Sequence, residues 1–379
     1  MKFLERATLS LQKLKELDGF RSLKSRERGI DFSSNDYLGF AQSEKLRSQT
    51  ELAYHGVQYN GSGGSRLLSG NHKEMESLET YLATFYESEA AILFNAGYNA
   101  NVGLIGSIGG ESDCFICDAY IHASLHDGLK FSKAKKVFFQ HNSLEDLEKK
   151  LKEEESRQGQ IFVLVESLYS MDGDFAPLTE MAQLCQAYQA ALIVDEAHAG
   201  GVLGRQGRAC VDALGLNAQV FARVITFGKA FGSHGAVVLC NSLLKSFLIN
   251  FSRPFIFSTS MSLHNISQIK AALALLIEEG DFHRKILFDR IDLFLTLRLK
   301  SHLADRYSAN CSPIQTFSCK DNQEALQLSD FLYDAGFDIR PIRFPSVPRG
   351  KERLRICIHS FNSGFEIENL FEAIEKYYI

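Results

Sequence analysis

The stretch Val224–Gly235, VITFGKAFGSHG, is the point from which the fold can be predicted. Its apolar start predicts a short buried strand, and the turn that follows places Gly228, Gly232 and Gly235 around Lys229. Glycine leaves little bulk near the lysine amine, so a flat ligand can approach it closely. A lysine amine that is shielded from water loses its proton near neutral pH, and it can then attack a carbonyl to give a Schiff base. A solvated surface lysine is the alternative, and stretches upstream decide between the two.

A second apolar run ends in a carboxylate, in the stretch 191–204 with the sequence ALIVDEAHAGGVLG. Asp195 lies at the carboxyl end of the predicted strand, where open parallel sheets bind ligands, and His198 follows in the next turn. A buried carboxylate needs a cation, and the protonated ring nitrogen of pyridoxal phosphate is one candidate. A helix N-cap or a structural ion pair is the alternative role for Asp195.

A third apolar run, in the stretch 161–174 with the sequence IFVLVESLYSMDGD, ends in polar residues that include Glu166 and Ser170. Strands alternate with helical segments in this part of the chain, which predicts a mostly parallel sheet. The carboxyl ends of parallel strands meet at one edge, so we expect Ser170, Asp195 and Lys229 to be neighbours there. This repetition predicts a cofactor site on a doubly wound α/β sheet.

The turn Asn95–Asn101, NAGYNAN, leads from a short strand into a helix. Small residues at such a turn present free backbone N–H groups and the positive end of the helix dipole, which makes a phosphate site in principle. The glycine-rich stretch 59–70, YNGSGGSRLLSG, has neither the glycine spacing of a dinucleotide-binding turn nor the lysine of a P-loop. By its pattern, this second stretch is therefore not a nucleotide loop.

Six motifs occur in the order in which one enzyme family has them: FSSNDYLGF, GSGGSRLLSGNH, SMDGDFAPL, VDEAHAGGVLGRQGR, TFGKAFG and FSTSMS. From about Asp31 to its C-terminus the chain resembles that family, the α-oxoamine synthases, which are fold-type-I enzymes dependent on pyridoxal 5'-phosphate (PLP). The resemblance is greatest to the branch that condenses L-alanine with a pimeloyl thioester in biotin biosynthesis, releasing CO2 and the free thiol carrier. It implies a PLP-dependent acyltransferase that needs no metal.

The resemblance also implies a role for each site residue. Lys229 binds the cofactor and acts as general base, Asp195 keeps the ring nitrogen protonated, and His122 of the motif HASL stacks on the ring. The cofactor-binding residues that it implies are Gly97, Tyr98, His122, Ser170, Asp195, His198, Thr226, Lys229 and Thr259. The substrate-binding residues that it implies are Arg21, His122, Ser346 and Arg355. Tyr98 stands where phenylalanine is common in the family, a change that a backbone contact to phosphate should tolerate.

The pattern of the sequence changes near residue 262, which predicts a domain boundary there. We expect an N-terminal helix and arm in residues 1–45, a large PLP-binding domain in 46–262, and a smaller C-terminal domain in 263–379. The expected fold class is α/β, that of a fold-type-I PLP-dependent transferase with a large, mostly parallel sheet domain and a smaller α+β domain. Apolar positions in residues 2–24 predict an amphipathic helix that packs on the main body or on a partner subunit.

Composition excludes several other functions. The 379 residues are 45% hydrophobic and 23% charged, as in an ordinary globular enzyme, and the net charge of -5 gives no general attraction to nucleic acid or anionic membranes. No apolar run approaches the ~20 residues that span a bilayer. The pair Cys114 and Cys117 lacks a second pair or a histidine cluster, so we interpret it as core packing rather than a metal or redox site. The eight dispersed cysteines fit a reducing cytoplasm.

Alternative functions stay open at this stage. Within the family they are a glycine C-acetyltransferase and a serine-using palmitoyltransferase, although GSGGSRLLSGNH fits the biotin branch better. Outside the family, the alternative is a non-catalytic binding protein on the same fold. The joint presence of Lys229, Asp195, His198 and His122 argues against it. Either coenzyme A or an acyl carrier protein can carry the acyl group. The resemblance also implies a homodimer, in which the glycine-rich stretch and FSTSMS complete the site across subunits.

Overall fold

The computed structural model describes residues 2–23 and 29–379, so Met1 and residues 24–28 of the predicted N-terminal arm lie outside the described residues. The chain forms two compact units. The larger contains residues 38–170 and 175–284, and the smaller contains the described residues up to 37 together with 171–174 and 285–379. These boundaries follow chain contacts, and the three-part domain division given above stays a prediction.

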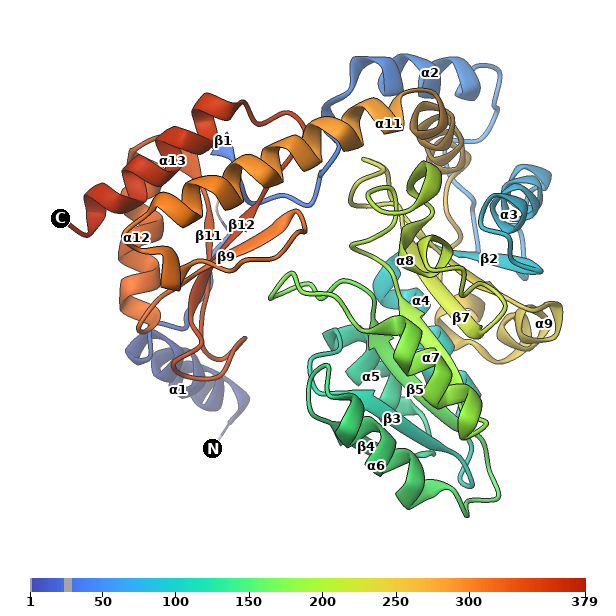
Figure 1. Cartoon of the computed structure of the whole chain (residues 1–379). Helices are drawn as coiled ribbons and strands as arrows, with labels where there is room; N and C mark the ends of the chain where they lie inside the picture. The colour runs from blue at the N-terminus through green and yellow to red at the C-terminus, as the bar shows by residue number, and fades with distance from the viewer. Residues whose placement is uncertain (1, 24–28) are drawn as a thin grey trace. The chain divides into compact units, whose positions relative to one another are not determined.

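The larger unit is built on one seven-stranded sheet of order β2-β8-β7-β6-β5-β3-β4 (Figure 1). Its strands are β2 (Ala90–Phe94), β3 (Cys114–Asp118), β4 (Lys135–Phe139), β5 (Ile161–Glu166), β6 (Ala191–Asp195), β7 (Val220–Thr226) and β8 (Ala236–Cys240). The five strands from β7 to β4 are parallel, and β8 runs antiparallel to both of its neighbours. This confirms the predicted α/β class with a mostly parallel sheet, whose central strands are apolar runs because both faces are covered.

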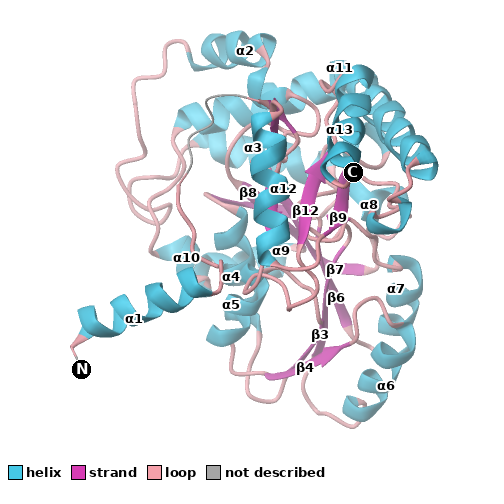
Figure 2. Ribbon diagram, turned by 90° about the vertical axis from the view of Figure 1, so that its left-hand side faces the viewer, coloured by secondary structure: helices cyan, strands magenta, loops and turns pink. Residues whose placement is uncertain are grey.

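Helices cover the sheet on both faces, with α4 and α5 on one side and α6 and α7 on the other (Figure 2). The helices of this unit are α2 (Glu44–Tyr54), α3 (Lys73–Phe85), α4 (Gly97–Ile108), α5 (Ala123–Phe131), α6 (Leu144–Glu154), α7 (Leu178–Ala187), α8 (Ala209–Ala213), α9 (Ser242–Phe251) and α10 (Arg253–Ile256). A short 3-10 turn, Phe40–Gln42, precedes α2, and another, Arg205–Gly207, precedes α8.

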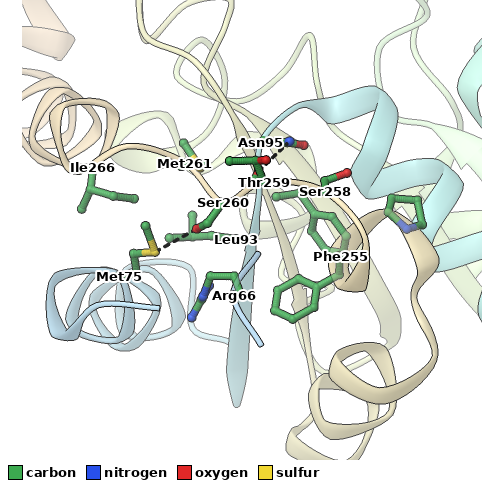
Figure 3. A pocket seen from close by; sticks show the side chains of 12 residues that line it. Arg66, Met75, Leu93, Asn95, Phe255, Ser258, Thr259, Ser260, Met261 and Ile266 are labelled. Carbon is green, nitrogen blue, oxygen red and sulfur yellow. Dashed lines mark hydrogen bonds between the residues drawn. The ribbon is translucent and has the colours of Figure 1, made fainter. Parts of the chain in front are cut away.

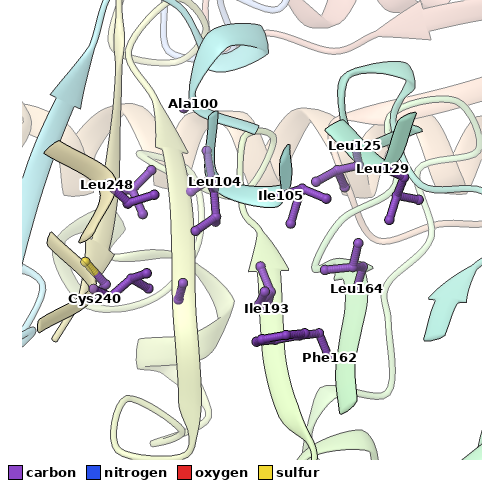
Figure 4. Close-up of a cluster of buried hydrophobic side chains, with 14 of the residues drawn as sticks. Ala100, Leu104, Ile105, Leu125, Leu129, Phe162, Leu164, Ile193, Cys240 and Leu248 are labelled. Atoms are coloured by element: carbon purple, nitrogen blue, oxygen red, sulfur yellow. The ribbon is translucent and has the colours of Figure 1, made fainter. Parts of the chain in front are cut away.

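The core under α4 and α5 fixes these helices against the strands that carry the site. Leu104, Ile105 and Leu125 pack on Leu164 and Ile193 of the sheet, and all five are at most 1% exposed (Figure 4). Burial of an aliphatic side chain of this size contributes about 1.5–3 kcal/mol to folding. The N-termini of α4 and α5 are therefore held firmly at the carboxyl edge of the sheet.

The smaller unit is α+β. An antiparallel sheet of order β11-β12-β9 joins Arg340–Ile342, Arg353–Cys357 and Ile314–Ser318, and β1 (Ile30–Asp31) pairs in parallel with β10 (Phe337–Asp338). Its helices are α1 (Phe3–Glu16), the part of α11 (Leu263–Lys300) from residue 285 onward, α12 (Asn322–Asp334) and α13 (Gly364–Tyr377), with a 3-10 turn at Ala304–Arg306. The apolar spacing of residues 365–378 predicts an amphipathic helix there, and the apolar face of α13 is buried, since Ile367, Leu370, Phe371 and Ile374 are at most 5% exposed.

Two helices differ from the sequence-based expectation. α1 ends at Glu16, well before residue 24, because Asp18 adopts a left-handed φ of 49° and breaks the helix. No residue of α1 is buried within the chain. For the second helix, the sequence predicts a long helical run over 263–277 that leads into further helix, and the structure has α11 (Leu263–Lys300) as one continuous helix of 38 residues. No helix within residues 2–23 and 29–379 combines the length and the apolar character that crossing a membrane requires.

Candidate active site

The carboxyl edge of the larger sheet brings Lys229 and His198 together. Lys229 follows β7 and His198 follows β6, the neighbouring strand, and Lys229 Nζ lies 2.7 Å from His198 Nε2. The lysine is of intermediate exposure rather than fully buried, so the expected dry environment is incomplete in the chain alone. What distinguishes Lys229 is its imidazole partner, which holds the amine in one place.

Asp195 is buried, with 5% of its surface exposed, and both of its oxygens accept hydrogen bonds. Oδ1 accepts the backbone N–H of Ala197 at 2.9 Å, and Oδ2 accepts Asn101 Nδ2–H at 2.7 Å. The first bond resembles the turn-capping role considered from the sequence, but neither partner supplies a cation. The charge of the carboxylate is therefore oriented by neutral donors, which suits a site that receives its cation from a ligand.

A hydrogen-bonded chain links Asp195 to His122 through two residues that sequence analysis missed. Asn101 Nδ2 also donates to Ser124 Oγ at 2.9 Å, and Ser124 Oγ lies 2.7 Å from His122 Nδ1. Asn101 is 3% exposed, and Ser124 is fully buried. The available signal was the asparagine Asn101, which stands between the apolar residues Ala100 and Val102 in the first half of α4.

His122 caps the N-terminus of α5, since its Nδ1 accepts the N–H of Ser124 at 3.2 Å. The imidazole keeps a solvent-exposed side, yet the protein atoms around it desolvate it and lower its pKa. Asp195 opposes that shift, and Lys229 adds to it. A neutral ring with one open face can stack against a flat ligand.

Ser170 is positioned by a buried glutamate that the sequence-based site did not include. The backbone N–H of Ser170 donates to Glu166 Oε2 at 3.2 Å. Glu166 ends β5 and is the register partner of Asp195 on β6. The three strands that precede Ser170, Asp195 and Lys229 therefore do end at one edge of the sheet. The hydrogen bonds described here join each of the three residues to a different partner: Ser170 to Glu166, Asp195 to Asn101, and Lys229 to His198.

The start of α4 offers a cradle for an anion. Ala96 is the N-cap residue and makes no side-chain capping bond, which leaves the N–H groups of the first turn uncapped by a side chain. A Cβ at Gly97 would lie 2.5 Å from Thr226 Cγ2, so only glycine allows this approach of α4 to β7. The Tyr98 side chain points away and donates to Asp127, which agrees with a role for its backbone alone.

A small pocket adjoins this cradle at the end of β2 (Figure 3). It is lined by Asn95, Thr259 and Arg66 among others, and Asn95 Nδ2 donates to the carbonyl of Thr259 at 3.3 Å. The glycine-rich stretch packs on FSTSMS within the same chain, because Ser62 Oγ donates to the carbonyl of Ser260 at 2.9 Å. Thr259 is thereby held beside Asn95, two residues before Gly97.

The predicted substrate-binding residues lie in the smaller unit. Arg21 Nη2 donates to Ser346 Oγ at 2.5 Å, so these two are in contact as a pair. Arg355 Nη2 donates to Asn35 Oδ1 at 3.0 Å and to Tyr37 Oη at 3.4 Å. Burial lowers the pKa of Arg355, but Cys357 and Tyr37 outweigh it, and the net pKa is raised. The guanidinium is a fixed cation.

Comparison with known proteins gives consistent results. The family model for aminotransferase class I and II matches residues 27–374. An 8-amino-7-oxononanoate synthase of Emericella nidulans is 37% identical, over 91% of this chain and 88% of that protein. One of Lysinibacillus sphaericus is 36% identical, over 91% and 87%.

Two solved structures are similar over nearly the whole chain. A serine palmitoyltransferase from S. paucimobilis, with a bound PLP–myriocin aldimine, has a TM-score of 0.90 at 27% identity, covering 99% of this chain and 98% of that one. An 8-amino-7-oxononanoate synthase from Francisella tularensis has a TM-score of 0.78 at 28% identity, covering 92% and 98%.

Proposed function

The chain belongs to the class I and II aminotransferase family and, within it, to the α-oxoamine synthases, and from this premise we propose that it condenses L-alanine with a pimeloyl thioester to give 8-amino-7-oxononanoate. The enzyme is a PLP-dependent acyltransferase. The observation that carries the choice of reaction is the 37% identity to an 8-amino-7-oxononanoate synthase over 91% of this chain. The proposed reaction serves biotin biosynthesis and releases CO2 and the free thiol carrier.

The residues at the sheet edge fit pyridoxal 5'-phosphate, which we propose as the cofactor. Its aldehyde would meet Lys229, its ring nitrogen Asp195, and its phosphate the uncapped start of α4 at Gly97. When bound, it supplies an electron sink that stabilises a carbanion next to its ring. The Gly97 cradle supports this assignment independently of the family, because the first turn of α4 has no side-chain cap at Ala96 and its N–H groups can bind an anion.

Each protein group then has a task suited to its contacts. Lys229, held 2.7 Å from His198, removes and returns the α-proton of the amino acid. Asp195, whose orientation is set by Asn101, would keep a proton on the ring nitrogen. His122 offers its open face to the ring. We expect Ser170 and His198 to hydrogen-bond the phenolic oxygen, and we expect Tyr98, Thr226 and Thr259 to hold the phosphate region.

Substrate binding is proposed for the arginines of the smaller unit. A carboxylate is best held by a planar guanidinium, which can donate two parallel hydrogen bonds. Arg355 is oriented in advance by Asn35 and Tyr37, so little side-chain entropy is lost when it binds the carboxylate of alanine. Arg21 and Ser346, already paired, are proposed to meet the acyl substrate.

A second candidate is serine palmitoyltransferase activity, which the TM-score of 0.90 favours. Measuring kcat/KM for alanine, glycine and serine against pimeloyl, acetyl and palmitoyl thioesters separates the candidates. Alanine with pimeloyl should be the best pair, and glycine should be a poor substrate rather than none, because one methyl group is worth only ~1–3 kcal/mol. If serine with palmitoyl or glycine with acetyl is best, the biotin assignment fails and the family assignment stands. Supplying the pimeloyl group on coenzyme A and on an acyl carrier protein identifies the carrier.

We also propose that the protein is a cytoplasmic homodimer. The cytoplasmic location is supported by the absence of any disulfide among the described cysteines, seven of which are buried. The dimer is inferred from the family, in which the glycine-rich stretch and FSTSMS complete the site across subunits. Sedimentation at assay concentration should show a dimer, and a fully active monomer would contradict it.

A further inference from the structure

Glu166 and Asp195 are two buried carboxyl groups on neighbouring strand ends. They are register partners in the parallel pair β5 and β6, so their side chains leave the same face of the sheet, and neighbouring strands lie about 4.8 Å apart. Glu166 is 2% exposed and Asp195 is 5% exposed. Two like charges at this separation, away from water, oppose each other strongly.

The two carboxyl groups differ in how many of their oxygens accept a hydrogen bond. Both oxygens of Asp195 accept hydrogen bonds, from Asn101 and from the backbone of Ala197. Glu166 Oε2 accepts the N–H of Ser170, whereas Oε1 is buried and has no hydrogen-bond partner among the described residues. An ionised carboxylate with a bare buried oxygen is costly, while a neutral acid is much less so.

Elsewhere the larger unit supplies a cation to a buried glutamate. Glu196 pairs with Arg223 at 2.7 Å, Glu79 with Arg66 at 2.7 Å, and Glu154 with Arg157 at 2.7 Å. Glu166 is in no ion pair of the described residues. The charged groups that act on it are Asp195, Lys229 and Asp118, and burial followed by Asp195 raises its pKa well above the ordinary value, with Lys229 opposing.

We propose that Glu166 is a positioning residue that stays a neutral carboxylic acid in the folded enzyme, fixing Ser170 through its backbone and leaving Asp195 the one negative charge of the pair. This inference rests on the proposed function, because it gives Ser170 and Asp195 their roles toward PLP. If Glu166 is neutral, Asp195 is the one anion of the pair that acts on the ring nitrogen. An ionised Glu166 would place a second anion beside Lys229 and alter the proton affinity of its amine.

The direct test is infrared spectroscopy of the cofactor-free protein at neutral pH, where a protonated carboxylic acid has a carbonyl band apart from those of carboxylates. Wild type should show this band and Glu166→Gln should lack it. The matched control is Asp118→Asn, a buried acid whose Oδ1 accepts the backbone N–H of Tyr120 at 2.7 Å and whose Oδ2 accepts that of Asn142 at 2.8 Å. This control should retain the band. Identical spectra for wild type and Glu166→Gln would overturn the proposal.

A second test uses the holoenzyme. Glu166→Gln keeps an uncharged acceptor for Ser170, so the pH midpoint of the lysine–cofactor absorption and the KM for alanine should stay close to wild type. Glu166→Ala removes the acceptor and should weaken PLP binding about 3- to 10-fold. A fall of the midpoint by about one unit or more in Glu166→Gln would show that a negative charge had been removed and would refute neutrality. Neither readout requires a pimeloyl substrate, so failure of the biotin assignment is distinguishable from failure of this inference.

Discussion

Replacing Gly97 by alanine tests whether the start of α4 is the phosphate cradle. The Cβ of alanine would lie 2.5 Å from Thr226 Cγ2, and Gly97 is not among the glycines with positive φ, so this methyl group is the obstacle rather than the backbone. Either the first turn of α4 or the end of β7 must move, and overpacking of this kind costs about 1–3 kcal/mol. If the displaced N–H groups bind the phosphate, the Kd for PLP should rise about 5- to 150-fold.

The assay is a titration of cofactor-free protein with PLP, followed by absorption of the lysine adduct, in four proteins. These are wild type, Gly97→Ala, Thr226→Ser and the double variant. Thr226→Ser removes Cγ2 but keeps Oγ1, which donates to the carbonyl of Ala197 at 3.2 Å. The double variant should therefore recover to within about threefold of Thr226→Ser. Wild-type affinity in Gly97→Ala, or no recovery in the double variant, would refute the reasoning.

Three further predictions follow from the same geometry. Lys229→Ala should be unable to bind the cofactor covalently; borohydride reduction of wild type and peptide mapping should label Lys229, and a label on another lysine contradicts the assignment. Asp195→Asn should bind PLP but lose turnover by roughly 30-fold or more, since a charge-assisted partner of the ring nitrogen is worth about 2–3 kcal/mol; a kcat within a few-fold of wild type excludes the role. Burial lowers the pKa of His359, whose bonds to Ser34 and Asn362 oppose the shift, so the unfolded chain binds more protons than the folded one below about pH 6.5. The free energy of unfolding should therefore fall as the pH drops below about 6.5, and the urea midpoint should fall less in His359→Gln; an equal pH dependence in both proteins contradicts this.

The sequence was informative wherever a residue type and its nearest neighbours fix the local outcome. Apolar runs ending in polar residues predicted Asp195 and Ser170 at the ends of two strands. In the structure Asp195 is the last residue of β6, and Ser170 follows β5, which ends at Glu166. The apolar face of α13 was predicted from helical spacing for the same reason. Such patterns depend on side-chain alternation and helical period, which are properties of a short segment.

Helix length was less predictable. Residues 263–300 contain no proline, the residue that interrupts a helix most strongly. One helix therefore continues over the whole range. α1 is the opposite case, since its helical pattern runs past Glu16 but Asp18 takes a left-handed conformation. A few tenths of a kcal/mol per residue decide such ends, and tertiary packing readily outweighs them.

The sequence by itself predicted the strand ends and the glycine turns, and it assigned the family through six motifs in order; Lys229 as the reactive lysine stays its prediction. Only the tertiary structure decided that Asn101 orients Asp195 at 2.7 Å and that Glu166 faces Asp195 across a strand pair. These partners are 94 and 29 residues apart in the chain. Their proximity depends on which strands are neighbours and in which register they pair, and register is fixed by burial and hydrogen bonding over the whole sheet rather than by any one segment.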